Sequence, residues 1–263
     1  MPLGNPQNFM IATQGRIENP FIIFLSYLLV PTIINMFLLF FVIKIFYREH
    51  FRSGYLFHGR EQIKDKQLAS IARFSLSALL FLIFIKILSS FLGLGFTIEL
   101  VHITIFVAAV ALAFSNKRIF IIKKVDWHTL IYFASMFVLM QSVWDTGFFQ
   151  SVLNDLHLDI SSVPIIFAIS VILSQFISNV PLVALFIPIL SHANASLTEL
   201  MALAAGSTIA GNLSILGAAS NVIIIQNAEK RAKESLSFFE FSKIGVPLTL
   251  LNILVYWLYF AIL

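Results

Sequence analysis

The segment from residue 198 to residue 226 constrains the fold of this chain more than any other. Its 29 residues contain one charged side chain, Glu199, and as a helix they could cross a bilayer core of about 30 Å. Twelve of the nineteen residues in 202–220 are nevertheless Gly, Ala or Ser, where a helix facing lipid would carry Leu and Phe. Small and amide residues at this depth indicate backbone that approaches another group closely. Because unwound backbone in a membrane is tolerated only where protein or a polar cavity covers it, we expect a broken helix that lines a transport site.

The composition places the chain in a membrane. Of its 263 residues, 59% are hydrophobic and 11% are charged, whereas a soluble domain has about 25% charged residues. The net charge of +4 comes from short loops between apolar segments, so it does not indicate nucleic-acid binding. The chain has no Cys, which excludes disulfides and thiolate metal sites. We therefore expect an all-α, multi-pass protein of the cell membrane (plasma or inner membrane).

Apolar segments divide the chain into membrane spans. We predict full spans at residues 20–47, 69–92, 97–114, 127–148 and 242–263. The segment 163–190 is interrupted at Ser178 and Asn179, and its two arms of about 22 Å and about 15 Å are each too short to cross the bilayer. We interpret it as a re-entrant hairpin with these two residues at its tip. The alternative is one kinked span of 28 residues.

The distribution of basic residues supports the hairpin. Fifteen of the seventeen Lys and Arg residues lie in or beside the loops at 48–66, 116–126 and 230–243, and the loops between them contain none. Cytoplasmic loops are enriched in Lys and Arg, so these three loops should lie on one side of the membrane. This requires the segment 163–190 to leave the membrane on the side where it entered.

Two segments of the chain are similar to each other. Residues 3–11 resemble residues 216–224, and each copy is followed by a polar loop, a Pro, an Asn and a long apolar run. The loop charges give the two copies opposite orientations. Inverted repeats with broken helices in matching positions are typical of secondary transporters and indicate a binding site near the middle of the membrane. The matching residues are Pro31 and Asn35 in the first copy and Pro247 and Asn252 in the second.

The repeat also predicts the domain boundaries. The first copy begins in the middle of its broken helix, so we expect an N-terminally truncated chain. A missing N-terminal repeat or a separate upstream polypeptide would supply the partner hairpin. The predicted parts are the end of the first repeat (1–47), a cytoplasmic basic loop (48–68) and the second repeat (69–263), which contains scaffold helices, the hairpin (163–190), the broken helix (198–226) and the last span (242–263).

The interrupted segments carry groups that can bind a small ion. Asn179 has one acceptor and two donors, and Ser178 and Ser220 have hydroxyls. Unwound carbonyls at residues 214–218 suit a hard cation, whereas the N-terminal ends of half-helices favour an anion. In the alternative interpretation these residues only hold helices together, as small and amide residues commonly do in membranes.

Three motifs point to one group of proteins. They are Ser178-Asn179-Val180-Pro181 at the hairpin tip, the sequence GSTIAGNLSILGAASN at residues 206–221, and LGNPQN at residues 3–8. They resemble the ion transporter superfamily, and most closely its citrate-transporter-like and arsenite-permease-like anion permeases. The resemblance covers essentially the whole chain and corresponds to the C-terminal portion of a full-length member.

The resemblance implies a secondary active transporter that moves a small anion by alternating access, either citrate or another dicarboxylate, or arsenite or another inorganic oxyanion. Sodium-coupled relatives bind sodium and a substrate carboxylate with a Ser-Asn-Thr tip, which Ser178 and Asn179 match while Val180 departs from it. The implied Na⁺ ligands are Ser178, Asn179 and Asn221. The candidate substrate-binding and ion-binding residues are Ser178, Asn179, Pro181, Asn212, Ser214, Gly217, Ser220, Asn221, Asn5 and Asn8.

Two other functions stay open: a sodium/proton antiporter of the same superfamily, and an inactive fragment of such a carrier. An enzyme is disfavoured because the sequence has no His-Glu-x-x-His motif, no paired intramembrane Asp and no Gly-x-Ser-x-Gly elbow. We expect no cofactor other than a coupling Na⁺ or H⁺. The expected partners are a small anion and the lipid bilayer, with no nucleic acid, and a homodimer is left open.

Overall fold

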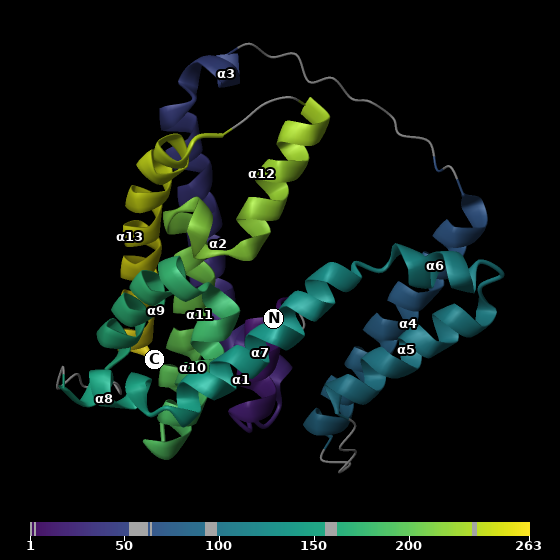
Figure 1. The fold of residues 1–263 in the computed structure, drawn as a ribbon, viewed down its shortest axis with the longest axis horizontal. Helices are drawn as coiled ribbons and strands as arrows, with labels where there is room; N and C mark the ends of the chain where they lie inside the picture. Colours follow the sequence, from purple (N-terminus) through teal and green to yellow (C-terminus); the bar gives the residue numbers. More distant parts are fainter. Residues whose placement is uncertain are drawn as a thin grey trace. The chain divides into compact units, whose positions relative to one another are not determined.

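The helical architecture predicted from the sequence is confirmed. The computed structural model describes residues 2, 4–52, 63, 65–92, 99–155, 162–232 and 236–263. Every regular element in this part of the chain is a helix (Figure 1). Three helices are long and apolar enough to cross a membrane, namely α2 (Pro20–Phe46), α4 (Lys66–Phe91) and α13 (Phe238–Ile262). Three shorter helices are also apolar, namely α5 (Leu100–Phe114), α9 (Val163–Ile177) and α10 (Asn179–His192).

The chain forms two compact units. The first comprises Met1–Gly54 and Phe133–Leu263, and the second comprises Tyr55–Tyr132. One helix, α7 (Trp127–Asp145), belongs to both units. The division into two repeats made from the sequence stays a prediction, and the predicted loop at residues 93–95 lies outside the described residues.

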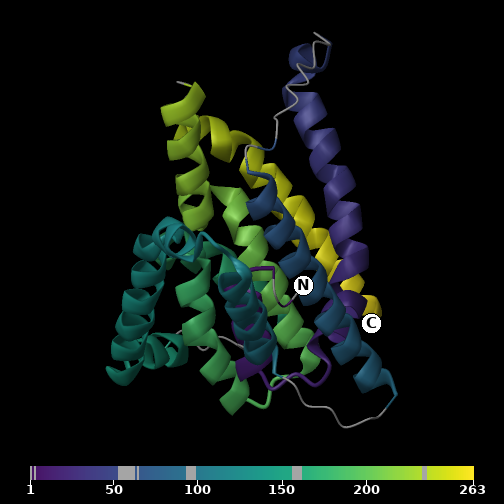
Figure 2. The same ribbon diagram turned by 90° about the vertical axis from the view of Figure 1, so that its right-hand side faces the viewer.

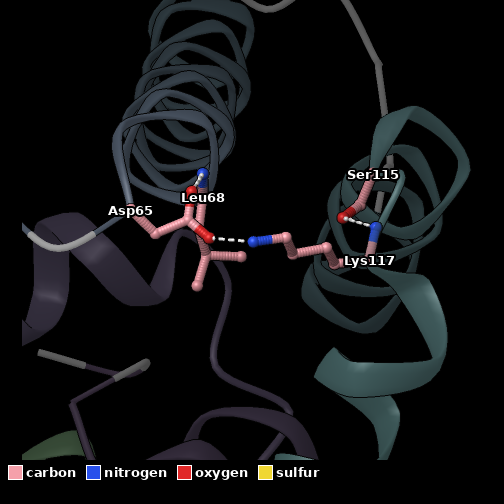
Figure 3. Close-up of polar contacts among 4 residues, drawn as sticks. All are labelled: Asp65, Leu68, Ser115 and Lys117. Atoms are coloured by element: carbon pink, nitrogen blue, oxygen red, sulfur yellow. Dashed lines mark hydrogen bonds and ion pairs between the residues drawn. The ribbon is translucent and has the colours of Figure 1, made fainter.

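The second unit is built on the antiparallel pair α4 and α5, followed by the short α6 (Arg118–Lys124). Asp65 accepts a hydrogen bond from the backbone N–H of Leu68 (3.0 Å), and its other oxygen pairs with Nζ of Lys117 (2.5 Å). The backbone N–H of Lys117 donates to Oγ of Ser115 (Figure 3). The Leu68 amide, and then Lys117, hold the pKa of Asp65 below its usual value. The pair links the start of α4 to the end of α5, although an exposed ion pair contributes little stability.

Helix α11 (Leu197–Leu213) is the centre of the first unit. It packs against α9, α10 and α13, and against α1 (Pro6–Gln14). Nearly all residues in 200–210 are buried, although many of them are Ala, Gly or Ser. These small residues let neighbouring helices come close: a Cβ added to Gly206 would lie 3.0 Å from Cβ of Ser170 in α9.

The single charge of the 198–226 segment has a structural role at the start of α11. Oγ of Ser196 accepts a hydrogen bond from the backbone N–H of Glu199 (3.4 Å), and the Glu199 carboxylate accepts one from the N–H of Ser196 (2.7 Å). This capping box satisfies two N–H groups that the helix leaves free, and the negative charge is favourable at a helix N-terminus.

Helices α9 and α10 form the hairpin predicted for residues 163–190. The chain turns back at Ser178, whose φ of 66° and ψ of 164° end one helix and begin the next (Figure 1). The arms contain 15 and 14 residues, so each is about 22 Å long or less. The second arm is longer than predicted because it begins at Asn179 and continues past residue 190 to His192.

The broken helix is also present. Helix α11 ends at Leu213, a 3₁₀ turn named η1 (Ile215–Gly217) follows, and α12 (Ala219–Ala232) continues beyond the predicted end at residue 226.

The predicted span at residues 127–148 is wrong in its boundary. Helix α7 ends at Asp145, and Gly147, with a φ of 70°, separates it from α8 (Phe148–Asp155). A positive φ is readily adopted by Gly and stops a helix, and this turn separates α8 from the span.

The Lys and Arg residues of the first unit are concentrated at one end, and Arg16, in the turn after α1, lies near the opposite end. Figure 1 shows α3 (Arg48–Arg52), the end of α12 and the start of α13 at one end, and the turn between α10 and α11 at the other. The residues at the first end include Arg48, Arg52, Lys230, Arg231 and Lys243. This arrangement agrees with the sidedness predicted from the loop charges.

Single-cysteine labelling can test this sidedness, because the chain has no Cys of its own. We expect Ser151→Cys and His192→Cys to react from one side of the membrane, and Arg52→Cys and Glu229→Cys to react from the other. The measurement is labelling by a membrane-impermeant maleimide in intact cells and in inverted vesicles. If the segment crossed the membrane instead, Ser151→Cys and His192→Cys would react from opposite sides.

Gly245 allows α13 to approach the end of α11. A Cβ at this position would overlap the backbone oxygen of Asn212. We expect Gly245→Val to lower the free energy of unfolding by about 1–3 kcal/mol, as overpacking does elsewhere. Unfolding in detergent, followed by heating or by denaturant, measures the change. Val246→Ala is the control, since its side chain is 42% exposed, and equal stability of the two variants would contradict the close contact.

Candidate functional site

The candidate site is the break between α11 and α12, where the backbone leaves the helical conformation. Ser214 and Ala218 are extended, with φ of −146° and −147°, on either side of η1. The last carbonyl groups of α11 therefore lose the N–H partners that a continuous helix would provide. Because such groups are costly to leave unsatisfied inside a membrane protein, side chains have to supply the missing donors.

Asn221, in the first turn of α12, supplies two of these donors. Its Nδ2 donates to the backbone oxygen of Gly211 (2.6 Å) and to that of Ser214 (3.3 Å). These two bonds use the amide nitrogen, so the side-chain oxygen keeps its acceptor capacity for an ion. The sequence analysis identified Asn221 as a site residue, and the structure gives it the role of closing the break.

Gln175, near the end of α9, joins the hairpin to the break. Its Nε2 donates to the backbone oxygens of Val171 (2.8 Å) and Ala210 (3.0 Å), and its Oε1 accepts a hydrogen bond from Oγ of Ser214 (2.7 Å). One amide thus satisfies a carbonyl of α11 and fixes the side chain of Ser214. The sequence analysis missed Gln175, for which the only signal was a single amide in an apolar arm, three residues before the hairpin tip.

Ser214 and Gly217 complete this network. Oγ of Ser214 also accepts a hydrogen bond from the backbone N–H of Leu216 (3.1 Å), which holds the 3₁₀ turn in place. A Cβ at Gly217 would overlap the backbone oxygen of Ala210 and lie 3.0 Å from Nε2 of Gln175. The close approach of η1 to α11 therefore requires Gly at this position.

The hairpin tip lies one turn beyond Gln175. Oδ1 of Asn179 accepts hydrogen bonds from the backbone N–H of Val180 (3.0 Å) and from Oγ of Ser178 (3.4 Å). Pro181 is buried in the first turn of α10, where a helix needs no N–H donor. The remaining N–H groups of this turn carry the positive end of the helix dipole, which favours an anion.

The other candidate residues have different surroundings. Asn212 is half-buried, with its backbone oxygen against Gly245, and Ser220 is exposed. Oδ1 of Asn5 caps α1 by accepting a hydrogen bond from the backbone N–H of Asn8 (2.8 Å). The side chain of Asn8 is 6% exposed, and its Oδ1 has no partner among the described residues.

The structure thus divides the predicted site residues into groups. Helix α1 packs on α10 and α11, but within the described part of the chain no hydrogen bond joins Asn5 or Asn8 to the hairpin tip. The predicted residues that lie together around Gln175 are Ser214, Gly217 and Asn221, and the tip residues Ser178, Asn179 and Pro181 follow Gln175 within two turns.

The site is electrically neutral. None of the predicted site residues is ionisable, and the described residues contain no group of three or more His, Cys, Asp or Glu that could hold a metal ion. Its amide and hydroxyl oxygens suit a hard cation of low charge, whereas the starts of α10 and α12 suit an anion.

A comparison with models of known protein families identifies the family of this chain. The model of the citrate transporter family matches residues 1–199. The chain belongs to this family. The matched part contains α1 and the hairpin with its tip, and it ends at the start of α11. The resemblance seen in the sequence motifs is therefore confirmed, and the chain is a multi-pass membrane protein of a transporter family.

Several curated proteins are similar to parts of the chain. The putative transporter arsB of Dictyostelium discoideum is 32% identical over 144 residues, which cover 51% of this chain and 25% of that protein. The 46 kDa membrane protein of Mycobacterium leprae is 31% identical over 145 residues, or 50% of this chain and 33% of its own length. The human P protein is 32% identical over 196 residues, or 67% of this chain and 23% of its own length.

The matched region spans about a quarter to a third of each of these relatives. The comparison with solved structures found no match.

The amide of Gln175 should be required for a stable break. In Gln175→Leu, the backbone oxygen of Ala210 and the hydroxyl of Ser214 lose their partner, which we expect to cost about 1–3 kcal/mol per buried group. Hydrogen exchange should then accelerate at residues 210–218, and the unfolding temperature should fall. Gln141→Leu is the matched control, because the exposed Gln141 bonds only to Asp145. Unchanged exchange in Gln175→Leu would contradict the assigned role.

Proposed function

We propose that this chain is the ion-binding and substrate-binding part of a secondary active transporter for a small anion, which works by alternating access and is coupled to a cation. Membership of the citrate transporter family supports a membrane anion transporter rather than an enzyme. The observation that carries the proposal is the pair of helix interruptions, at Ser178 and at residues 214–218. Gln175, three residues before Ser178, bonds to Ala210 and Ser214 at the second interruption.

The two interruptions provide complementary binding groups. Helices α10 and α12 both begin at an interruption, so their free N–H groups and dipoles favour a negative charge there. The side-chain oxygens of Ser178, Asn179 and Asn221 favour a hard cation such as Na⁺. Binding the anion and the cation together keeps the whole site close to neutral, which lowers the cost of moving both through the membrane.

The nature of the anion follows from the absence of charge at the site. Without Lys or Arg among the site residues, a carboxylate or an oxyanion has to be held by amides and by the bound cation. Val180 stands where the dicarboxylate-binding tip has a hydroxyl, which favours an anion of low charge over a dicarboxylate.

Site-directed substitution with transport measurements tests the proposal. We expect Asn179→Ala to reduce uptake of labelled arsenite or citrate into proteoliposomes at least about tenfold, since it removes hydrogen bonds to the bound ligand. Asn221→Ala should reduce uptake as much and should also destabilise the break. Uptake should depend on an inward Na⁺ gradient, and dissipation of a pH gradient by Na⁺ without an anion would indicate an antiporter instead.

The matched control is Asn194→Gly. Asn194 lies in the exposed turn after α10 with a φ of 53°, a conformation that Gly adopts without strain. Its uptake should equal that of the unchanged chain. Unchanged uptake in both Asn179→Ala and Asn221→Ala, with normal membrane insertion, would contradict the assignment of the site. The same assay of the chain with and without a co-expressed N-terminal half of a family member tests the inactive-fragment alternative.

A further inference from the structure

Two helices of the first unit carry the same polar pair. Helix α2 contains Thr32 and Asn35 just after Pro31, and α13 contains Thr249 and Asn252 just after Pro247. In each helix the Thr and Asn are three residues apart, so they lie on the same face.

The contacts between these helices place the two asparagines opposite each other. The rings of Tyr27 and Phe260 lie 6.2 Å apart, and the hydroxyls of Thr32 and Tyr256 are 2.7 Å apart. Farther along, the hydroxyl of Tyr47 donates to Glu240. In these three contacts the residue number in α13 falls as the residue number in α2 rises. The two helices are therefore antiparallel, as Figure 2 also shows. Asn35 lies between the second and third of these contacts, at the level of Asn252.

Three side-chain oxygens at this level and within one helical turn of it are buried without a hydrogen-bond partner. They are Oδ1 of Asn35, Oδ1 of Asn252 and Oγ1 of Thr249, and no donor from the described part of the chain reaches them. The three side chains are 9%, 5% and 1% exposed. A helical Thr usually satisfies its hydroxyl with a carbonyl of the preceding turn, so the free oxygen of Thr249 is unusual.

The third wall of this region is α11, and it offers no donor either. Gly245 touches the backbone oxygen of Asn212, so one turn farther Thr249 reaches the level of Thr208. The hydroxyls of Ser207 and Thr208 both donate to the backbone oxygen of Ala204. The unpaired oxygens of this region therefore belong to neutral side chains, and neither hydroxyl donates to them.

We propose that Asn35, Thr249 and Asn252 form a binding site for a small monovalent cation of the sodium class, between α2, α11 and α13. Neutral oxygens are the ligands that hard cations take, and the absence of a carboxylate favours a single over a double charge. A cation satisfies all three acceptors at once, and backbone oxygens or water complete its coordination. This site is separate from the Na⁺ ligands proposed at Ser178, Asn179 and Asn221, and does not depend on the proposed anion transport.

The test is Na⁺ binding to the purified full chain in detergent. Binding of ²²Na⁺ and the unfolding temperature are measured in NaCl, KCl and choline chloride at equal ionic strength. We expect Na⁺ to raise the unfolding temperature above its value in choline chloride. Thr249→Val, which keeps the shape and removes only the hydroxyl, should weaken Na⁺ binding about tenfold, because it removes one ligand of a charged group. Asn252→Leu should weaken it at least as much.

Thr208→Val is the control, since it removes a hydroxyl of the exposed Thr208 in α11 that is already bonded to its own helix. Its Na⁺ affinity should stay within about twofold of the unchanged chain. Equal stabilisation by NaCl and choline chloride, with no bound ²²Na⁺, would show that the oxygens are only hydrated and would overturn the proposal. Loss of Na⁺ binding in Asn221→Ala but not in Thr249→Val would also overturn it. If the unchanged chain binds Na⁺ but transports no anion, the result contradicts only the proposed function and not this cation site.

Discussion

The hydrogen bonding of the interrupted backbone is the constraint on which the first unit depends. A helix that stops inside a membrane protein exposes carbonyl groups, and lipid provides no donor for them. Here the donors are side-chain amides: Asn221 serves the carbonyls of Gly211 and Ser214, and Gln175 serves that of Ala210. These three carbonyl groups therefore have donors although the helix is interrupted, and the starts of α10 and α12 remain available for a ligand.

Small residues make this arrangement sterically feasible. Gly217 lets η1 reach α11, Gly206 lets α9 reach it, and Gly245 does the same for α13. A Cβ at Gly217 or Gly245 would overlap a backbone oxygen, and a Cβ at Gly206 would crowd Ser170, so the unwound region and its packing favour the same composition. The chain is therefore rich in Gly, Ala and Ser where a lipid-facing helix would be rich in Leu, and polar groups come close to one another because their side chains are short.

The sequence predicted the elements whose signals are local. Ser178, Asn179 and Pro181 interrupt an apolar run, and Gly217 and its small neighbours interrupt another, so both breaks could be placed in advance. Gln175 could not, because its role depends on carbonyls that lie 35 residues away in the chain. The end of α7 was missed as well, since hydrophobicity continues past Gly147 while the helix does not.

Residues that align between the two repeat copies make different hydrogen bonds in the structure. Asn8 and Asn221 correspond in the sequence, yet Asn221 donates to carbonyls before its helix, whereas the backbone of Asn8 is capped by Asn5 and its own side-chain oxygen is buried and unpaired. Within the described residues, the second copy follows the end of α11, whose carbonyl groups accept hydrogen bonds from Asn221. A buried acceptor that no neighbour satisfies is costly, so Asn8 should be matched by a donor or a cation in the functional state. The same argument applies to Asn35 and Asn252, whose free oxygens lie at one level between two antiparallel helices. In both places the unsatisfied groups are neutral acceptors, and a small cation is the ligand that neutral acceptors select over an anion.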